Sequence, residues 1–310
     1  MGKIYKYCRS EMVEKIFNIP GKFGIKFSYL KDYNDPYEYF LTIDFNRQHE
    51  ILAYYLEMIN MHTTFLATCF SRSPINTPMW AHYGDNSQGF VLEIDEDKLC
   101  QYLKSMGRCY LVGNIKYKDS PDADLENLLE RAYCIGKPRY VDMLSRRIIG
   151  VAYFTKQTCW SYEQERRIIV SEDFFSNDNY LKVLNLPREV ITSIIVGHRA
   201  SNQVKRALAD IANDIKVENF IMKPGKIASS PFLINKNLET YIFMNKNISK
   251  CDYFCSECNE PLKYDKEKCS WCEISDYDKE QAALINPFRI MARYGLLEEY
   301  IENTNRIFKK

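Results

Sequence analysis

Four cysteines near the end of the chain have the spacing of a metal site. Cys255 and Cys258 form one Cys-x-x-Cys pair, Cys269 and Cys272 form another, and ten residues separate the two pairs. Each pair makes a tight turn that points two thiolates at one place, and four sulfurs complete the tetrahedron that zinc prefers. A closed four-sulfur site leaves no position for a reacting water, so we expect a structural zinc.

A fifth cysteine, Cys251, lies just before this group, so the first metal ligand could be either Cys251 or Cys255. The Cys-x-x-Cys geometry favours Cys255. Residues 251–275 are therefore predicted to form a small zinc ribbon, which at this size needs its metal in order to fold. The other six cysteines share no metal spacing, and no motif pairs any of the four histidines with a thiol, which argues against a cysteine hydrolase.

Three further blocks combine aromatic, acidic and amide residues beside predicted strands. They are residues 34–38 (NDPYE), 79–84 (MWAHYG) and 160–167 (WSYEQERR). Catalytic functional groups in loops at strand ends are better explained by a site than by packing. The structural alternatives are an Asx-turn at Asn34 and Asp35, a helix that packs Trp80 and Tyr83 into the core, and a solvated charged edge at residues 163–167.

In this order, the blocks resemble the bacterial family named domain of unknown function 2971, over about residues 4–200. The strings WAHYGDN and WSYEQERR are the specific parts of the resemblance. It implies a setting in phage defence or toxicity, and a kinship with ADP-ribosyltransferases. It also implies a split β-sheet core with helical insertions, which we place in a catalytic domain at residues 1–228.

The kinship implies roles for the two glutamates of the Glu-x-Glu turn. An ADP-ribosyltransferase breaks the bond between nicotinamide and ribose in NAD through an oxocarbenium-like state, which a nearby carboxylate stabilises. Glu165, which enters a predicted strand, resembles the catalytic glutamate, and Glu163 resembles the residue that faces the acceptor.

The same resemblance implies residues that bind the dinucleotide and the substrate. Ser28 resembles the polar residue of the second strand, and Tyr7 or Arg9 would fill the role of the first strand, where a His or Arg is expected. Trp80 and Tyr83 would bind the cofactor, and Tyr83 would stack on nicotinamide or a base. Asn34 and Asp35 would contact the substrate.

The elements that must position these residues indicate an α+β fold, because predicted strands and helices mix without strict alternation. Strands are predicted at residues 3–8, 25–30, 65–71, 89–94, 166–170 and 191–196, and helices at 10–18, 47–62, 79–83, 122–149 with a break at 136–138, and 201–213. Residues 229–250 are predicted to be a linker or crossing segment. Residues 276–310 should form short C-terminal helices divided near Asn286-Pro287 and Gly295.

Composition limits the class of protein. The net charge of +1 gives no global field for nucleic acid or a membrane surface, so an anion site must be local. No segment approaches the roughly 20 apolar residues of a membrane helix, and the first residues lack the apolar stretch of a signal peptide. We therefore expect a cytoplasmic protein without a membrane partner, whose thiols stay reduced.

The leading functional hypothesis is an NAD-dependent ADP-ribosyltransferase that acts as a toxin or anti-phage effector. Its acceptor would be a nucleic acid (RNA favoured over DNA) or a protein, and an antitoxin could bind its C-terminal helices. One alternative is a non-catalytic module that binds a nucleotide or nucleic acid and is stabilised by the zinc ribbon. Another is a metal-independent nuclease built on Asp35, Glu38, Glu163 and Glu165.

Overall fold

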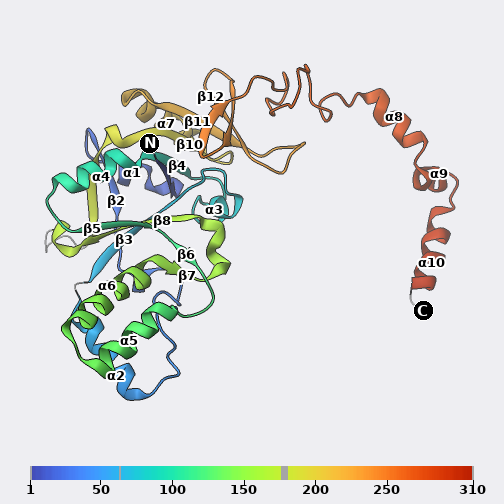
Figure 1. Ribbon diagram of the computed structural model, residues 1–310. Helices are drawn as coiled ribbons and strands as arrows, with labels where there is room; N and C mark the ends of the chain where they lie inside the picture. The colour runs from blue at the N-terminus through green and yellow to red at the C-terminus, as the bar shows by residue number, and fades with distance from the viewer. Residues whose placement is uncertain (1, 63, 176–180, 309–310) are drawn as a thin grey trace. The chain divides into compact units, whose positions relative to one another are not determined.

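One mixed sheet organises the first 250 residues of the computed structural model, which describes residues 2–62, 64–175 and 181–308 (Figure 1). Within these residues the sheet has ten strands, in the order β14-β13-β12-β11-β10-β4-β1-β3-β8-β5. The strands are β1 (Lys3–Cys8), β3 (Phe65–Ser71), β4 (Phe90–Asp95), β5 (Tyr110–Asn114), β8 (Glu165–Ser171), β10 (Ile191–Val196), β11 (Glu218–Lys223), β12 (Phe232–Asn235), β13 (Thr240–Met244) and β14 (Asn247–Lys250). Together with the helices around it, the sheet confirms the α+β class.

The centre of the sheet is built from the most apolar strands. All six residues of β4 are buried, and β4 pairs antiparallel with both β1 and β10. β10 continues into β11 as a parallel neighbour through α7 (Asn202–Asp214), because parallel strands need a crossover connection. Ile4, Leu92, Ile94 and Ile194 are fully buried in the resulting core.

The sheet splits between β1 and β3. These strands pair with each other at Tyr5 and Ser71. Beyond that point β1 pairs with β4, and β3 pairs with β8. On the open side of the split, Ser28 makes an antiparallel bridge to Ala67 of β3. Ser28 comes just after β2 (Lys22–Lys26), which pairs with β9 (Val183–Pro187). The split leaves a space lined by the backbones of β1 and β3.

A group of helices follows β2 and β5 in the sequence and packs around its own apolar centre. It contains α2 (His49–Asn60), α5 (Ala123–Ile135) and α6 (Pro138–Phe154) (Figure 1). Gly136, with φ 65°, ends α5 in the left-handed region, and Pro138 starts α6. This confirms the predicted break at residues 136–138. Three shorter helices pack in other apolar clusters of the sheet: α1 (Val13–Ile16), α3 (Thr77–His82) and α4 (Glu96–Ser105).

Residues 229–250 differ from the linker or crossing segment expected from the sequence. Strands β12, β13 and β14 lie there and extend the sheet beyond β11. β12 is buried throughout, β13 is mostly apolar and partly buried, and β14 is mostly polar. Each has only four or five residues, which is too short for a periodic pattern to be detected. Residues 230–250 therefore belong with residues 1–224, a body that we call the sheet unit.

The second compact body, the cysteine unit, contains residues 225–229 and 251–310. Its cysteine-rich loops carry one β-bridge, between Phe254 and Pro261. Helices α8 (Asp276–Leu284), α9 (Pro287–Arg293) and α10 (Leu297–Phe308) follow. The breaks fall at Asn286, which caps α9, and at Gly295 with φ 70°, as the sequence predicts.

Glu260 holds residues 226–228 against the cysteine-rich loops. Its side chain is almost fully buried, and its carboxylate accepts backbone N–H bonds from Lys226, Ile227 and Ala228 at 2.8–3.2 Å. Hydrogen bonds between a carboxylate and backbone N–H groups are among the stronger ones in proteins. This cluster explains why residues 225–229 belong to the cysteine unit although the sheet unit surrounds them in sequence.

Replacement of Glu260 by Ala should therefore release residues 225–229. The loss leaves three N–H groups without their acceptor, and we expect a destabilisation of the cysteine unit of about 2–3 kcal/mol. Glu257→Ala is the matched control, because Glu257 is half exposed and pairs with Lys268 at the surface. Hydrogen exchange at residues 226–228 measures the effect, and equal exchange in the two variants would contradict this role of Glu260.

Candidate functional site

A cavity of about 250 Å³ opens where β1 and β3 separate. Strand β1 contributes Tyr5, Lys6 and Tyr7 to it, and β3 contributes residues 67–71. The rest of the lining comes from other segments: Lys26, Ser28, Tyr33, Asn34, Met79, Tyr83, Lys156, Glu163 and Glu165. The split therefore brings together residues from all three blocks that the sequence singles out.

The Glu-x-Glu turn directs two carboxylates into this cavity. A 3-10 helix, Thr158–Glu163, ends at Glu163, and β8 begins at Glu165. Between them Gln164 is left-handed, with φ 46° and ψ 50°. Glu163 and Glu165, on either side of this residue, both line the cavity and both are only 4% exposed. The expectation of a solvated charged edge does not hold for these two residues.

Glu163 is the centre of a chain of polar contacts. Its Oε1 accepts a hydrogen bond of 2.6 Å from the Tyr83 hydroxyl, and its Oε2 accepts one of 2.8 Å from Lys156 Nζ. The Asn34 amide in turn donates to the Tyr83 hydroxyl at 3.2 Å. The first and second blocks thus meet the third through Glu163.

Glu165 is held by a different cation. Its Oε1 accepts a hydrogen bond of 2.6 Å from Arg167 Nε, and its Oε2 lies 3.6 Å from Lys156 Nζ. Arg167 is fully buried and donates through Nη1 and Nη2 to Glu38, at 3.1 and 2.9 Å. Three carboxylates and two cations therefore form one connected network behind the cavity.

The network gives the two glutamates opposite acid–base behaviour. Burial raises the pKa of Glu163, and Lys156 and Tyr83 offset this only in part. Burial acts on Glu165 in the same direction, but Arg167 and Lys156 outweigh it and lower the pKa to about 2. At neutral pH Glu165 therefore stays ionised, whereas Glu163 takes up a proton more readily. Two carboxylates whose environments separate their pKa values are suited to different roles in one reaction.

Lys156 lies between the two carboxylates. It belongs to β7 (Thr155–Lys156), which pairs with β6 (Lys116–Tyr117), and its Nζ is 4.5 Å from the centre of the Trp160 ring. Burial alone would lower the pKa of Lys156, but Glu165 and Glu163 reverse the effect and raise it. The side chain therefore remains a cation within the site.

The other predicted site residues have different surroundings. Tyr7 lines the cavity, yet its hydroxyl donates to the Ser73 carbonyl at 2.9 Å. Trp80 is 1% exposed, donates from Nε1 to the Pro74 carbonyl and lies edge-on to Tyr7, which is a core environment outside the cavity lining. Arg9 is exposed and lines a neighbouring hollow.

Of the two predicted substrate residues, Asn34 lines the cavity and Asp35 does not. Asp35 is buried, and its carboxylate accepts the Tyr37 backbone N–H at 3.0 Å. This is the Asx-turn that the sequence analysis gave as the alternative. It shapes the loop that presents Asn34 and Glu38.

Sequence reasoning gave no site role to Lys6, Tyr33 or Lys156. Lys6 Nζ donates to Thr68 Oγ1 and to the Cys69 carbonyl, both at 2.9 Å, across the space where β1 and β3 separate. Tyr33 donates to the Ala67 carbonyl at 2.8 Å. The sequence held one signal for Lys6: it is a lysine within a predicted strand. A lysine that becomes buried there needs polar partners.

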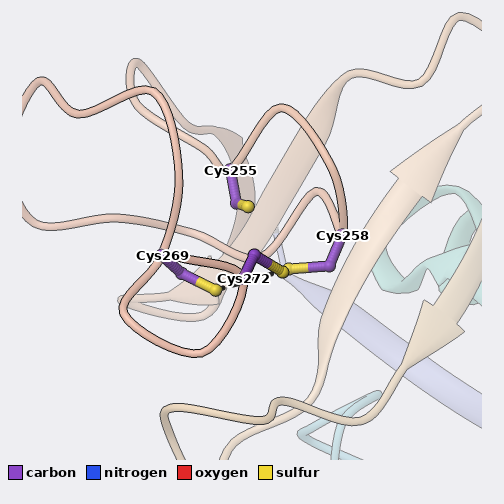
Figure 2. A group of neighbouring side chains, drawn as sticks. All are labelled: Cys255, Cys258, Cys269 and Cys272. Carbon is purple, nitrogen blue, oxygen red and sulfur yellow. Dashed lines mark hydrogen bonds between the residues drawn. The ribbon is translucent and has the colours of Figure 1, made fainter. Parts of the chain in front are cut away.

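The four predicted metal ligands gather at one point of the cysteine unit (Figure 2). The sulfurs of Cys255, Cys258, Cys269 and Cys272 all lie within 4.8 Å of one another, and those of Cys258 and Cys269 are 3.7 Å apart. Zinc–sulfur bonds of ~2.3 Å in a tetrahedron place the sulfurs ~3.8 Å apart. The cluster could therefore hold a metal ion such as zinc.

The environment of Cys255 suits a metal ligand. Burial opposes its ionisation, but backbone N–H groups of Cys258, Cys269 and Glu257 outweigh burial and lower its pKa to about 6. The thiolate is the form that binds a metal. Among the described residues Cys251 is not part of the four-cysteine cluster, and Cys255 is the first ligand that the geometry indicates.

Purified protein should contain about one zinc ion per chain. Cys258→Ser and Cys269→Ser should lose the metal and unfold residues 251–275, because the binding free energy of such a module is also its folding free energy. Cys251→Ser is the matched control and should keep the metal. Elemental analysis decides the point, and protein without zinc, or loss of zinc from the Cys251 variant, would contradict the assignment.

The ion pair of Arg167 predicts a pH-dependent stability. The folded pKa of Glu165 lies below its ordinary value near 4.5, so its contribution is complete above pH 4.5 and is lost as the pH falls towards 2. Arg167→Met leaves the buried Glu38 without its ion-pair partner and Glu165 with only Lys156, 3.6 Å away, and should cost about 3–5 kcal/mol at pH 7. The difference in unfolding free energy between the variant and wild type should be smaller at pH 3.5.

Urea unfolding at pH 7 and pH 3.5 tests this prediction. Arg146→Met, a change at an arginine whose side chain is 81% exposed, is the control and should alter stability little at either pH. A loss for Arg167→Met that is equally large at both pH values would show that the pairing with ionised carboxylates is not its origin.

Among the comparisons with known proteins, a family match covers the part of the chain that carries most of this site. No curated protein and no solved structure matches. None of the helices in the described ranges is long and apolar enough to cross a membrane. Residues 79–168, which include Tyr83, Lys156, Glu163, Glu165 and Arg167, match the family described as protein of unknown function (DUF2971). Over this stretch the chain is similar to that family.

Proposed function

We propose that the sheet unit is an NAD-dependent ADP-ribosyltransferase. The observation that carries the proposal is the position of Glu163 and Glu165 together in the cavity at the split of the sheet. The resemblance to ADP-ribosyltransferases leads us to expect such a split and a Glu-x-Glu turn beside it. Burial of charge is unfavourable, and both carboxylates are therefore paired with cations, Glu163 with Lys156 and Glu165 with Arg167, while they still line the cavity.

The charges of the network fit the transition state of this reaction. When nicotinamide leaves with the electron pair of its bond to ribose, positive charge develops at C1′. Glu38, Glu163 and Glu165 carry three negative charges when ionised, and Lys156 and Arg167 carry two positive charges, which leaves one net negative charge. Glu165, ionised and fixed by Arg167, would stabilise the ribosyl cation.

Glu163 suits the second half of the reaction. Its raised pKa brings it closer to neutral pH, which favours a general base. In transfer, the acceptor oxygen would form the new bond to C1′ while its proton passes to Glu163. The Tyr83 hydroxyl and Lys156 hold the carboxylate in place during this step.

The surroundings of the cavity offer groups for the rest of NAD. A neighbouring hollow shares Lys6, Tyr7, Lys26, Asn34 and Tyr83 with the cavity and adds Arg9 and His82. Lys26 and Arg9 are cations that suit the pyrophosphate, and Tyr83 offers a ring to the nicotinamide. Ser28 would bind the ribose side. Trp80 would support Tyr7 by packing against its ring and would not stack on the nicotinamide.

The biological role in this proposal is that of a toxin or anti-phage effector in the cytoplasm. The acceptor is a nucleic acid, with RNA favoured, or a protein. An antitoxin would neutralise the enzyme by binding the C-terminal helices, whose residues 276–308 include no buried side chain. Support for this setting comes from the family resemblance.

A second candidate function is a non-catalytic module that binds a nucleotide. Lys6, Lys26 and Lys156 all line the cavity, and three lysines favour an anionic ligand. The nuclease hypothesis has less support, because Asp35 is engaged in a turn away from the cavity. Turnover of NAD separates the first two candidates.

Purified protein should release nicotinamide from NAD and transfer labelled ADP-ribose to components of a cell extract. Glu165→Gln keeps the size of the side chain but removes its charge, and should lower nicotinamide release ~100-fold or more. Glu163→Gln should impair transfer more than NAD hydrolysis. Glu172→Gln is the control, because Glu172 is exposed just after β8 and outside the cavity.

The same variants should be compared in growth assays and by circular dichroism. Wild type should arrest bacterial growth, and folded Glu165→Gln should not. Release of nicotinamide at the wild-type rate by Glu165→Gln would reject the mechanism. Absence of NAD turnover by wild type, even with extract, would favour the binding module.

A further inference from the structure

A second cavity, of about 580 Å³, lies against the other side of the Glu-x-Glu turn. Gln164 lines this cavity, Glu163 lines the first, and Glu165 lines both. We call it the turn cavity. All of its lining residues belong to the sheet unit: Gly2, Lys3, Arg72, Asn114, Ile115, Tyr117, Gln164, Glu165, Asn245, Lys246 and Asn247. The turn is thus a thin wall that separates two cavities.

The lining of the turn cavity combines cations with amides. Lys3, Arg72 and Lys246 are positively charged, and Glu165 is the one acid in the lining. Four amide side chains, of Asn114, Gln164, Asn245 and Asn247, surround them. Lysine and arginine bind phosphates, and amides pair with the donor and acceptor groups of base edges. A protein surface patch would instead require apolar anchors, which this lining scarcely offers.

Arg72 is preorganised in this cavity. Its Nη1 donates to Glu96 at 2.7 Å, and its Nε and Nη2 lie 3.4 and 3.2 Å from Asn114 Oδ1. Its side chain remains 26% exposed. A guanidinium fixed in this way loses little conformational freedom when it binds a ligand.

Lys246 has an unusual backbone conformation for a lysine. It lies with Asn245 in the two-residue turn between β13 and β14, where Met244 pairs with Asn247. Both turn residues have positive φ, 51° for Asn245 and 64° for Lys246. Such turns strongly favour glycine at the second position, because a Cβ is disfavoured there.

The Lys246 side chain makes no ion pair with any described residue, and it is exposed. Its backbone conformation is imposed by the two-residue turn between β13 and β14 and not by an ion pair of its side chain with a described residue. Backbone strain of this kind is found preferentially where a residue serves a ligand. Lys246 stands beside the turn cavity with an ammonium group free to contact an anion.

We infer that the turn cavity binds a nucleotide of a single-stranded nucleic acid, with Lys246 and Arg72 on its phosphates and the amides on its base. This site is separate from the cavity of the proposed transfer reaction, because Glu163, which would take the proton of the acceptor, does not line it. Phosphates and bases are common to RNA and DNA, so the shared chemistry is that of a nucleotide in a flexible strand.

Fluorescence anisotropy tests this inference directly, without NAD in the mixture. The probes are labelled single-stranded RNA and DNA of one sequence, about 12 nucleotides long. Lys246→Gly should weaken binding ~3-fold or more and reduce the slope of log K against log salt by about 0.7, the value for one phosphate contact. Its melting temperature should equal or exceed that of wild type, because glycine suits the turn.

Lys246→Glu should weaken binding further. Lys236→Glu is the matched control, because Lys236 is an exposed lysine between β12 and β13 that lies outside the turn cavity. It should bind as wild type does. Tighter binding of RNA than of DNA would assign the site to RNA, and the reverse would assign it to DNA.

Two results would overturn the inference: no binding of either probe by wild type, or equal binding by the Lys246→Glu and Lys236→Glu variants. Either result leaves the transferase proposal standing, because nicotinamide release is measured separately. Conversely, absence of NAD turnover would reject the transferase and leave a binding result intact.

Discussion

The buried guanidinium of Arg167 is the constraint on which the candidate site depends. It lies in β8, between β3 and the edge strand β5, and is fully buried in ion pairs with Glu165 and Glu38. An unpaired charge in such a place would cost several kcal/mol, so the fold must bring both carboxylates to it. Glu38 comes from a loop 129 residues earlier in the sequence. That loop, the strand and the Glu-x-Glu turn must therefore close together, and the cavity forms as they do.

This constraint also separates the properties of the two glutamates. Glu165 shares its cation with Glu38 and stays ionised, whereas Glu163 reaches only Lys156 and the Tyr83 hydroxyl, so burial raises its pKa. Two residues that are equivalent in a sequence motif thus acquire different chemistry from their neighbours. In the proposed transferase, the ionised carboxylate meets the ribosyl cation and the more basic one meets the acceptor. The left-handed Gln164 between them lines the turn cavity instead, where we infer that a nucleotide binds.

Much of this organisation could be predicted from the sequence, because it depends on local pattern. The central strands follow from apolar runs such as that of β4, and the cysteine cluster follows from spacing alone. The Arg167 network could not be predicted, since nothing in the string EQERR distinguishes a buried arginine from a solvated one. Trp80 was predicted to bind the cofactor but lies in the core, because an aromatic residue on a short helix suits either place. Strands β12–β14 were missed since each has only four or five residues, too few for a periodic pattern to be detected.

The central claim is that the cavity between β1 and β3 holds NAD with its reacting ribose at the Glu-x-Glu turn. An experimental structure of the protein with a non-hydrolysable NAD analogue tests it most directly. The account predicts density for the analogue in this cavity, with the nicotinamide ribose within hydrogen-bond distance, about 3 Å, of the Glu165 carboxylate. The pyrophosphate should lie towards Lys26 and Arg9. An analogue bound elsewhere on the sheet unit, or an empty cavity at saturating concentration, would contradict the account.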